Sequence, residues 1–304
     1  MSGSCWVAIV VMLVGCASQP RTLDDRLATM VRSHRGRVAV FAHDLATGRT
    51  IAIDADREVK TASAIKLAVL IAAFHQVKAG QVALADRVVL EDRAKVYGSG
   101  VLPFLHGGLE LTFEDALVLM MILSDNTATN LAIDHVGGVA AVNRRLAALG
   151  LAHTHLYKKV YVPATEPMPP DQKQFGLGKS TARELATLML SIQRCELGDP
   201  ALCQRMLAIM RNQHARYLSA RFLETADTSE TPSAIAAKLG ELDAARIEVA
   251  LIAGRAGPIV LAVVTYENAD VRYSPENEGG LLISRIAEAV VRAWSPAGIE
   301  TGKP

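Results

Sequence analysis

Ser63 and Lys66 have the types and the spacing of a nucleophile and its base. Residues three apart at the start of a helix share one face, so the Lys66 amine can reach the Ser63 hydroxyl. A helix N-terminus also offers free N–H groups and positive potential to an oxyanion. Residues 67–71 are all apolar, which predicts a buried helix in which desolvation turns the amine into a base. The alternative is a capping serine and a lysine that reaches solvent.

Two further motifs could complete a site. Ser124–Asn126 (Ser-Asp-Asn) follows the apolar run 116–123, and its alternative interpretation is a helix cap, because all three residue types favour caps. Lys238–Gly240 (Lys-Leu-Gly) ends a predicted strand, where the lysine can attract a carboxylate and the glycine lets the backbone approach closely. A second Lys-x-Gly at Lys78–Gly80 shows that this pattern alone is weak.

The elements that must position these residues follow from hydrophobic periodicity. Strand patterns occur near both chain ends, helical periodicity dominates from residue 61 to about 211, and Thr112 with Asp115 resembles a capping box. A polar loop is expected at 225–233. The predicted outer elements are a helix at 22–34, strands at 37–43, 50–53, 234–239, 247–253 and 259–266, and a closing helix at 277–294.

This order predicts an α/β (α+β) fold with one antiparallel sheet built from both chain ends, flanked by helices, and an inserted all-helical domain. We expect the sheet domain to comprise residues 22–66 and 216–296 and the helical domain residues 67–215. A cleft between two such lobes is the usual place for a site.

Taken in order along the chain, the three motifs resemble those of class A β-lactamases and penicillin-binding proteins. Residues 126–131 (Asn-Thr-Ala-Thr-Asn-Leu) and the glycine pair 137–138 are similar to the family's continuation after its serine. The resemblance covers about residues 25–296. It implies a five-stranded sheet, a small β-lactam or peptide substrate, and no metal or cofactor.

The resemblance also implies a role for each matching residue. Ser63 would be the nucleophile, Lys66 its base or proton relay, and Ser124 would pass a proton to the leaving amine. Asn126 would hold the substrate amide, and Lys238 would attract the substrate carboxylate.

Three further assignments follow from the same resemblance. The backbone N–H groups of Ser63 and Glu241 would form the oxyanion hole. Tyr97 stands where the family often keeps an aromatic wall, and Arg246 would add affinity for a carboxylate. Simple packing and a surface charge are the alternatives for Tyr97 and Arg246.

The chain departs from the family at two places. Leu239 replaces a Thr or Ser whose hydroxyl would bind the substrate carboxylate, an interaction worth about 1.5–3 kcal/mol, so we expect roughly ten- to hundredfold weaker β-lactam recognition unless Arg246 compensates. The glutamate that activates the deacylating water would fall at Val160 when counted forward from Gly150, or at Glu166 when counted back from Ser180. Without this base, the acyl-enzyme would form and persist.

The first twenty residues resemble a targeting segment. An apolar run at 6–14 is too short to span a bilayer but suits a signal peptide. Leu13–Cys16 resembles a lipobox, in which Cys16 would be lipidated and would anchor the protein at the periplasmic face of a membrane. The alternative is an ordinary signal peptide and a soluble periplasmic protein. In such a compartment Cys195 and Cys203 could form a disulfide, or they could be two buried thiols.

Composition narrows the function classes. The 304 residues carry a net charge of +1 with interleaved signs, so we expect no nucleic-acid partner and a monomer. His153 and His155 are the only closely spaced histidines, which disfavours a zinc enzyme. Three hypotheses remain: a β-lactam hydrolase, a peptidase or esterase of the same fold, and a non-catalytic binding lipoprotein. A buried lysine disfavours the third.

Overall fold

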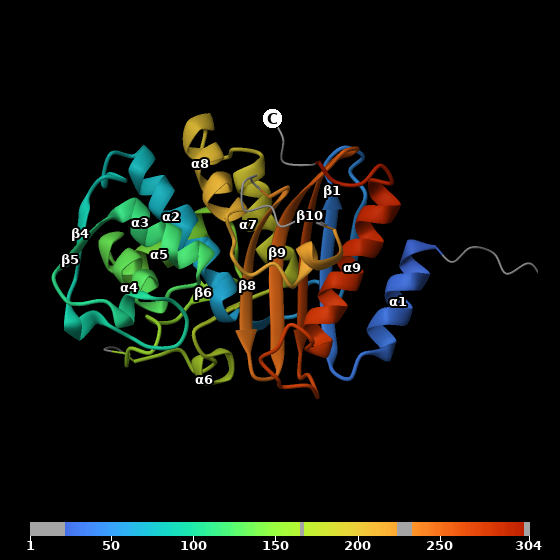
Figure 1. The fold of residues 1–304 in the computed structure, drawn as a ribbon, viewed down its shortest axis with the longest axis horizontal. Coiled ribbons are helices and arrows are strands. Elements are labelled where there is room, and N and C mark those ends of the chain that lie inside the picture. The colour runs from blue at the N-terminus through green and yellow to red at the C-terminus, as the bar shows by residue number, and fades with distance from the viewer. Residues whose placement is uncertain (1–21, 165–166, 224–232, 301–304) are drawn as a thin grey trace, which may run out of the picture.

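The structure is a computed structural model that describes residues 22–164, 167–223 and 233–300 (Figure 1). The predicted signal segment with Cys16, the alternative base Glu166 and all of the predicted 225–233 loop except Ser233 lie outside the described residues. Within the described ranges, no helix combines the length and the apolar character needed to cross a bilayer. Export and lipid attachment therefore stay predictions.

The predicted sheet is confirmed. Five strands lie in the order β2-β1-β10-β9-β8, and each neighbouring pair is antiparallel. Strands from both chain ends meet where β1 pairs with β10, which leaves β8 as the edge strand toward the helical part. The strands are β1 (Arg37–Asp44), β2 (Thr50–Ile53), β8 (Ile235–Leu242), β9 (Ala245–Gly254) and β10 (Gly257–Tyr266).

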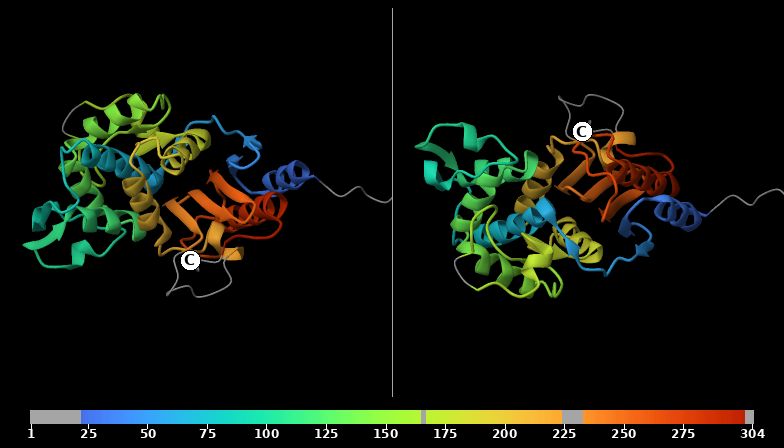
Figure 2. Two further views of the ribbon diagram at one scale, coloured as in Figure 1. Left: turned by 90° about the horizontal axis from the view of Figure 1, so that it is seen from above. Right: turned by 90° about the horizontal axis from the view of Figure 1, so that it is seen from below.

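The two faces of the sheet enter two different cores, because successive side chains of a strand point to opposite faces. Val38, Val40 and Ala42 of β1 belong to a buried cluster with the two terminal helices. Ala39 and Phe41 belong to the cluster that holds the helical part. Figure 2 shows the terminal helices on one side of the sheet and the remaining helices on the other. The terminal helices are α1 (Leu23–Ser33) and α9 (Glu278–Trp294).

The inserted helices surround α2, which is buried along nearly its whole length. Their apolar cluster continues onto the sheet through α7, which lies against β1, β9 and β10, so helices and sheet share one core. The domain limits at 67 and 215 stay predictions. The capping box of Thr112 and Asp115 is confirmed. These helices are α2 (Lys66–Lys78), α3 (Phe113–Ile122), α4 (Asn126–His135), α5 (Gly138–Ala148), α6 (Gln172–Phe175), α7 (Ala182–Gln193) and α8 (Pro200–Arg211).

The helical part contains short strands that periodicity did not predict. None is longer than four residues, too short for an alternating pattern to stand out from the helical one. They form a hairpin, β4 (Arg87–Leu90) with β5 (Leu109–Thr112), and a small sheet of β3 (Val59–Lys60), β7 (Gly178–Ser180) and β6 (His155–Leu156). Short 3₁₀ helices are η1 (Ala62–Ile65), η2 (Asp92–Ala94), η3 (Leu102–Phe104) and η4 (Ser219–Phe222).

The disulfide alternative for the two C-terminal cysteines is confirmed. Cys195, just after α7, is bonded to Cys203 in α8. Closing so short a loop restricts the unfolded chain and fixes the turn between two helices that pack on the sheet and on α2.

Candidate active site

Ser63 lies in a strained turn at the entrance to α2. The prediction of a helix start is refined here, because Ser63 sits in the 3₁₀ helix η1 and Lys66 is the first residue of α2. Ala62, directly before it, has a φ of 45°, a region that non-glycine residues rarely adopt. Thr61 anchors this turn by donating its N–H and its hydroxyl to the carbonyl of Gly178. Strain of this kind persists only where the surroundings hold it.

The Lys66 amine is fully buried and points at Ser124. Its Nζ lies 2.6 Å from the Ser124 carbonyl oxygen, 3.1 Å from the Ser124 hydroxyl and 2.9 Å from Oδ1 of Asn126. No hydrogen bond among the described residues joins this amine to the Ser63 hydroxyl, which corrects the expectation of a direct pair. Burial, followed by the charge of Lys238, places the pKa of Lys66 well below its usual value.

Neutral Lys66 can therefore act as a base through Ser124. An uncharged amine has two N–H groups and one lone pair, so it can donate to the Ser124 carbonyl and to Asn126 while it accepts from the Ser124 hydroxyl. The desolvation that makes this form stable comes from the all-apolar first turns of α2.

Lys238 reaches the same hydroxyl from the sheet. Its Nζ donates to the Ser124 hydroxyl at 3.2 Å and to the carbonyl of Leu239 at 2.9 Å, and the residue is fully buried. Burial lowers the pKa of Lys238 to about 7, against the opposing pull of Glu241 and Glu248. The two motif lysines thus converge on Ser124, which itself has a left-handed φ of 55° between α3 and α4.

Gly240 lets the edge strand β8 approach the nucleophile. A methyl group at position 240 would lie 2.6 Å from the Thr61 carbonyl oxygen and 3.0 Å from the amide nitrogen of Ser63. Only glycine allows this approach, which brings β8 against the amide of Ser63 one residue before Glu241. This placement suits the two predicted donors of an oxyanion hole.

Ser124–Asn126 contains the helix cap that is its alternative interpretation, and its catalytic role stays a prediction. Asp125 caps α4 by accepting from the N–H of Ala128 at 2.8 Å, and its other oxygen accepts from the N–H groups of Val101 and Leu102. Asn126 lines the pocket and donates one amide hydrogen to the Tyr97 carbonyl at 3.0 Å. Its remaining amide hydrogen can bind a substrate carbonyl.

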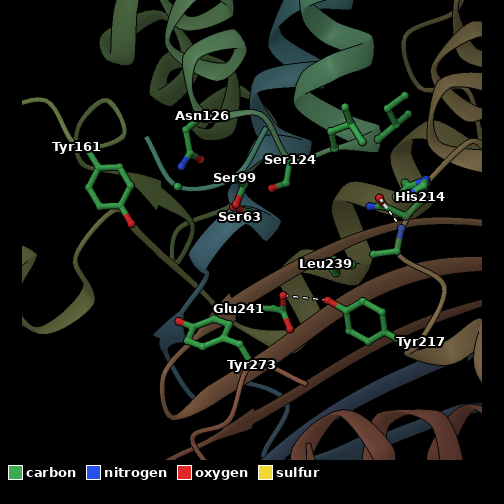
Figure 3. A pocket seen from close by; sticks show the side chains of 15 residues that line it. Ser63, Ser99, Ser124, Asn126, Tyr161, His214, Tyr217, Leu239, Glu241 and Tyr273 are labelled. Carbon is green, nitrogen blue, oxygen red and sulfur yellow. Dashed lines mark hydrogen bonds between the residues drawn. The ribbon is translucent and has the colours of Figure 1, made fainter. Parts of the chain in front are cut away.

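Ser63, Ser124 and Asn126 line one cavity of about 430 Å³, within the range of small-molecule sites. Figure 3 shows Ser63, Ser124 and Asn126 on one wall and Leu239 and Glu241 of β8 across from them. Sequence patterns missed several other lining residues. They stand in loops without a motif, and the set includes Ser99, Tyr161, Gln213, His214, Tyr217 and Tyr273.

Two predicted substrate contacts lie elsewhere. Tyr97 is 69% exposed, packs edge-on against Phe104 and does not line the cavity. The aromatic residues that line it are Tyr161, Tyr217 and Tyr273. The Arg246 side chain is buried, which rules out a surface charge, and its guanidinium is held by Glu241 and backbone carbonyls. It therefore does not face the cavity as a free cation.

Val160 lies where the forward count placed the deacylation base. Asn130 of α4 exchanges two hydrogen bonds with its backbone, accepting from the Val160 N–H at 2.8 Å and donating to its carbonyl at 2.9 Å. The next residue, Tyr161, lines the cavity. An apolar, buried side chain thus occupies this position.

The sequence model of the family described as "Beta-lactamase enzyme family" matches residues 22–294. The chain belongs to the β-lactamase enzyme family. A β-lactamase of Streptomyces fradiae is 31% identical over 131 residues, 42% of this chain and 43% of that one, so the match spans less than half of that relative.

Solved structures agree with this membership over the whole fold. The β-lactamase of Sphaerobacter thermophilus is 31% identical, with a TM-score of 0.77 over 90% of this chain and 97% of that one. A mutant of PBP-A, captured as an acyl-enzyme complex with penicillin-G, is 25% identical, with a TM-score of 0.75 over 90% and 96% of the two chains.

We predict that Gly240→Ala slows acylation of Ser63 about 10²-fold, the usual effect of losing one oxyanion-hole donor, because the methyl group displaces β8 from the Ser63 N–H. The measurement is the acylation rate by mass spectrometry, with thermal melting of the variant. Gly254→Ala is the matched control, since its methyl group would meet the Gly257 carbonyl at 2.7 Å at the far end of the sheet. Equal slowing in both variants would contradict the prediction.

Proposed function

We propose that this protein is a serine hydrolase that opens β-lactam amides through an acyl-enzyme on Ser63, with a mechanism of the class A type. The observation that carries the proposal is the convergence of two buried lysine amines on the Ser124 hydroxyl, at 3.1 and 3.2 Å, in the cavity that Ser63 lines. The names of its relatives support β-lactams as the acyl donors.

In the proposed acylation, one proton moves from the Ser63 hydroxyl to the leaving nitrogen. The Ser63 oxygen attacks the lactam carbonyl, and its proton passes through the Ser124 hydroxyl to neutral Lys66. The N–H groups of Ser63 and Glu241 hold the resulting oxyanion. As the carbon–nitrogen bond breaks, the Ser124 hydroxyl gives its proton to the leaving nitrogen and regains one from Lys66, which returns the amine to its neutral form.

A second candidate function has a specific observation in its favour. Val160 offers no carboxylate to activate a water, so the acyl-enzyme would persist, as in a penicillin-binding peptidase or esterase that acts on cell-wall peptides or other acyl donors. The PBP-A mutant captured with penicillin-G is a neighbour in which such an intermediate was observed. The two candidates share the acylation step and differ in the rate of deacylation.

Intact-protein mass spectrometry with penicillin G and with nitrocefin tests the proposal. Turnover or a covalent adduct in the parent, absent in Ser63→Ala, is the expected result. Rapid turnover favours the hydrolase, and a stable adduct favours the peptidase or esterase. Neither adduct nor turnover would overturn both and leave the non-catalytic binding lipoprotein. We also propose export with lipidation at Cys16, which the mass of the mature chain isolated from its native host checks.

We predict that Val160→Glu shortens the lifetime of the acyl-enzyme at least tenfold, because a positioned general base contributes about 10²–10⁴-fold. The measurement is the decay of the penicillin adduct. Val162→Glu, two residues along the same loop, is the matched control and should leave the lifetime unchanged. If Glu166→Ala, rather than Val160→Glu, changes the lifetime, Glu166 is the base and the forward alignment is wrong.

We predict a bell-shaped pH dependence of acylation for a carboxylate-bearing penicillin. The acid limb rises with pH because Lys66 must lose its proton, and burial already lowers the pKa of that amine. The alkaline limb falls above about pH 7, because burial lowers the pKa of Lys238 to about 7 and its neutral form no longer helps the Ser124 hydroxyl to release its proton. The methyl ester of the same penicillin should show the same two limbs. A fall that is absent for the ester would contradict this assignment.

A further inference from the structure

Two charged side chains pair with each other where β8 ends and β9 begins. Glu241 of β8 stands opposite Arg246 of β9, and Glu241 Oε1 lies 3.2 Å from Nε of Arg246. The Arg246 guanidinium also donates to the carbonyls of Leu242 at 2.6 Å, Ala245 at 2.8 Å and Arg272. Three hydrogen bonds to backbone carbonyls and complete burial hold this side chain inside the protein. It does not line the cavity, although its Nε has no hydrogen-bond partner among the described residues.

Glu241, by contrast, faces the cavity. Its side chain is 22% exposed and is a lining residue, and Oε2 accepts a hydrogen bond from the hydroxyl of Tyr217 at 2.9 Å. Figure 3 shows this bond across the floor of the cavity, beside Leu239. Two partners hold the carboxylate in place, and each of its oxygens keeps a lone pair for a further donor.

Leu239 and Glu241 are two apart on β8, so their side chains lie on the same side of the strand, and both line the cavity. Where the resemblance leads us to expect a hydroxyl and a free arginine for a substrate carboxylate, the wall carries an apolar side chain and a fixed carboxylate. No Lys or Arg is among the described lining residues. The nearby cations are Lys238, whose amine donates to Ser124 and to Leu239, and the buried Arg246, and neither of them lines the cavity.

We propose that this site selects acyl donors that carry an amide N–H, and no free carboxylate, beside the scissile bond, and that Glu241 is the specificity-determining residue. The inference rests on the proposed acylation of Ser63 and names its substrate class. A carboxylate on that side of the substrate meets Glu241 as a like charge in a partly desolvated cavity. An amide N–H at the same place donates to Glu241 and relieves that repulsion.

The experiment compares penicillin G with its methylamide and measures the acylation rate of each by intact-protein mass spectrometry. In the parent, the methylamide should react at least tenfold faster than the acid. In Glu241→Gln, which keeps an acceptor for Tyr217, the ratio should fall at least tenfold, mainly because the acid reacts faster. Glu110→Gln, on β5 in the helical part, is the matched control and should leave the ratio unchanged.

A second variant tests the inference if Glu241→Gln does not fold. If Glu241→Gln melts far below the parent, Leu239→Thr is the variant to compare. Its added hydroxyl should raise the acylation rate with the acid and leave the rate with the methylamide unchanged. Equal rates for acid and amide in the parent, or an unchanged ratio in the folded variant, overturn the inference alone. Failure of both probes to acylate Ser63 overturns the proposed function together with the inference, so the two failures are distinguishable.

Discussion

Two buried lysine amines share one hydroxyl, and the rest of the site depends on that arrangement. Lys66 and Lys238 lie 3.1 and 3.2 Å from the oxygen of Ser124, and both are fully buried. Two ammonium groups at this separation, away from water, repel strongly, so at least one amine is driven toward its neutral form. The proposed base of the reaction is thus produced by the fold and does not require a histidine. Among the described residues, only the Ser124 hydroxyl, with one proton and two lone pairs, contacts both amines, and it can move a proton between them.

The arrangement requires three segments that are far apart in the sequence to meet, and the backbone is strained or closely packed where they do. The turn before Ser63 holds Ala62 in a left-handed conformation, and Ser124 adopts another at the junction of α3 and α4. Gly240 lies against the amide of Ser63 where no larger residue fits. Each feature is unfavourable by itself and is stabilised by its neighbours. The shared core of helices and sheet supplies that stabilisation, since α2, α7 and one face of the sheet form one apolar cluster.

The sheet, the terminal helices and the motif residues could be predicted because each carries a local signal. Long apolar strands, the capping box of α3 and the Ser-x-x-Lys spacing are all visible within a dozen residues. The walls of the cavity carry no such signal. Tyr161 and Tyr273 come from irregular loops, and the partner of Arg246 was set by the register of β8 on β9, which the sequence does not show. The partner of the Lys66 amine was mispredicted for the same reason. The predicted partner was Ser63, which is close in sequence, and the observed partner is Ser124.

The proposed acylation residues are tied to the core through α2 and β8, so changing any of them disturbs several buried contacts at once. Val160 and Leu239 lie beside these residues, one in a loop held by Asn130 and the other on the edge strand of the sheet, and both side chains are buried. We propose that these two positions influence how long an acyl group stays and which acyl group enters. One scaffold could then keep its nucleophile while its outcome shifts between hydrolysis and stable acylation.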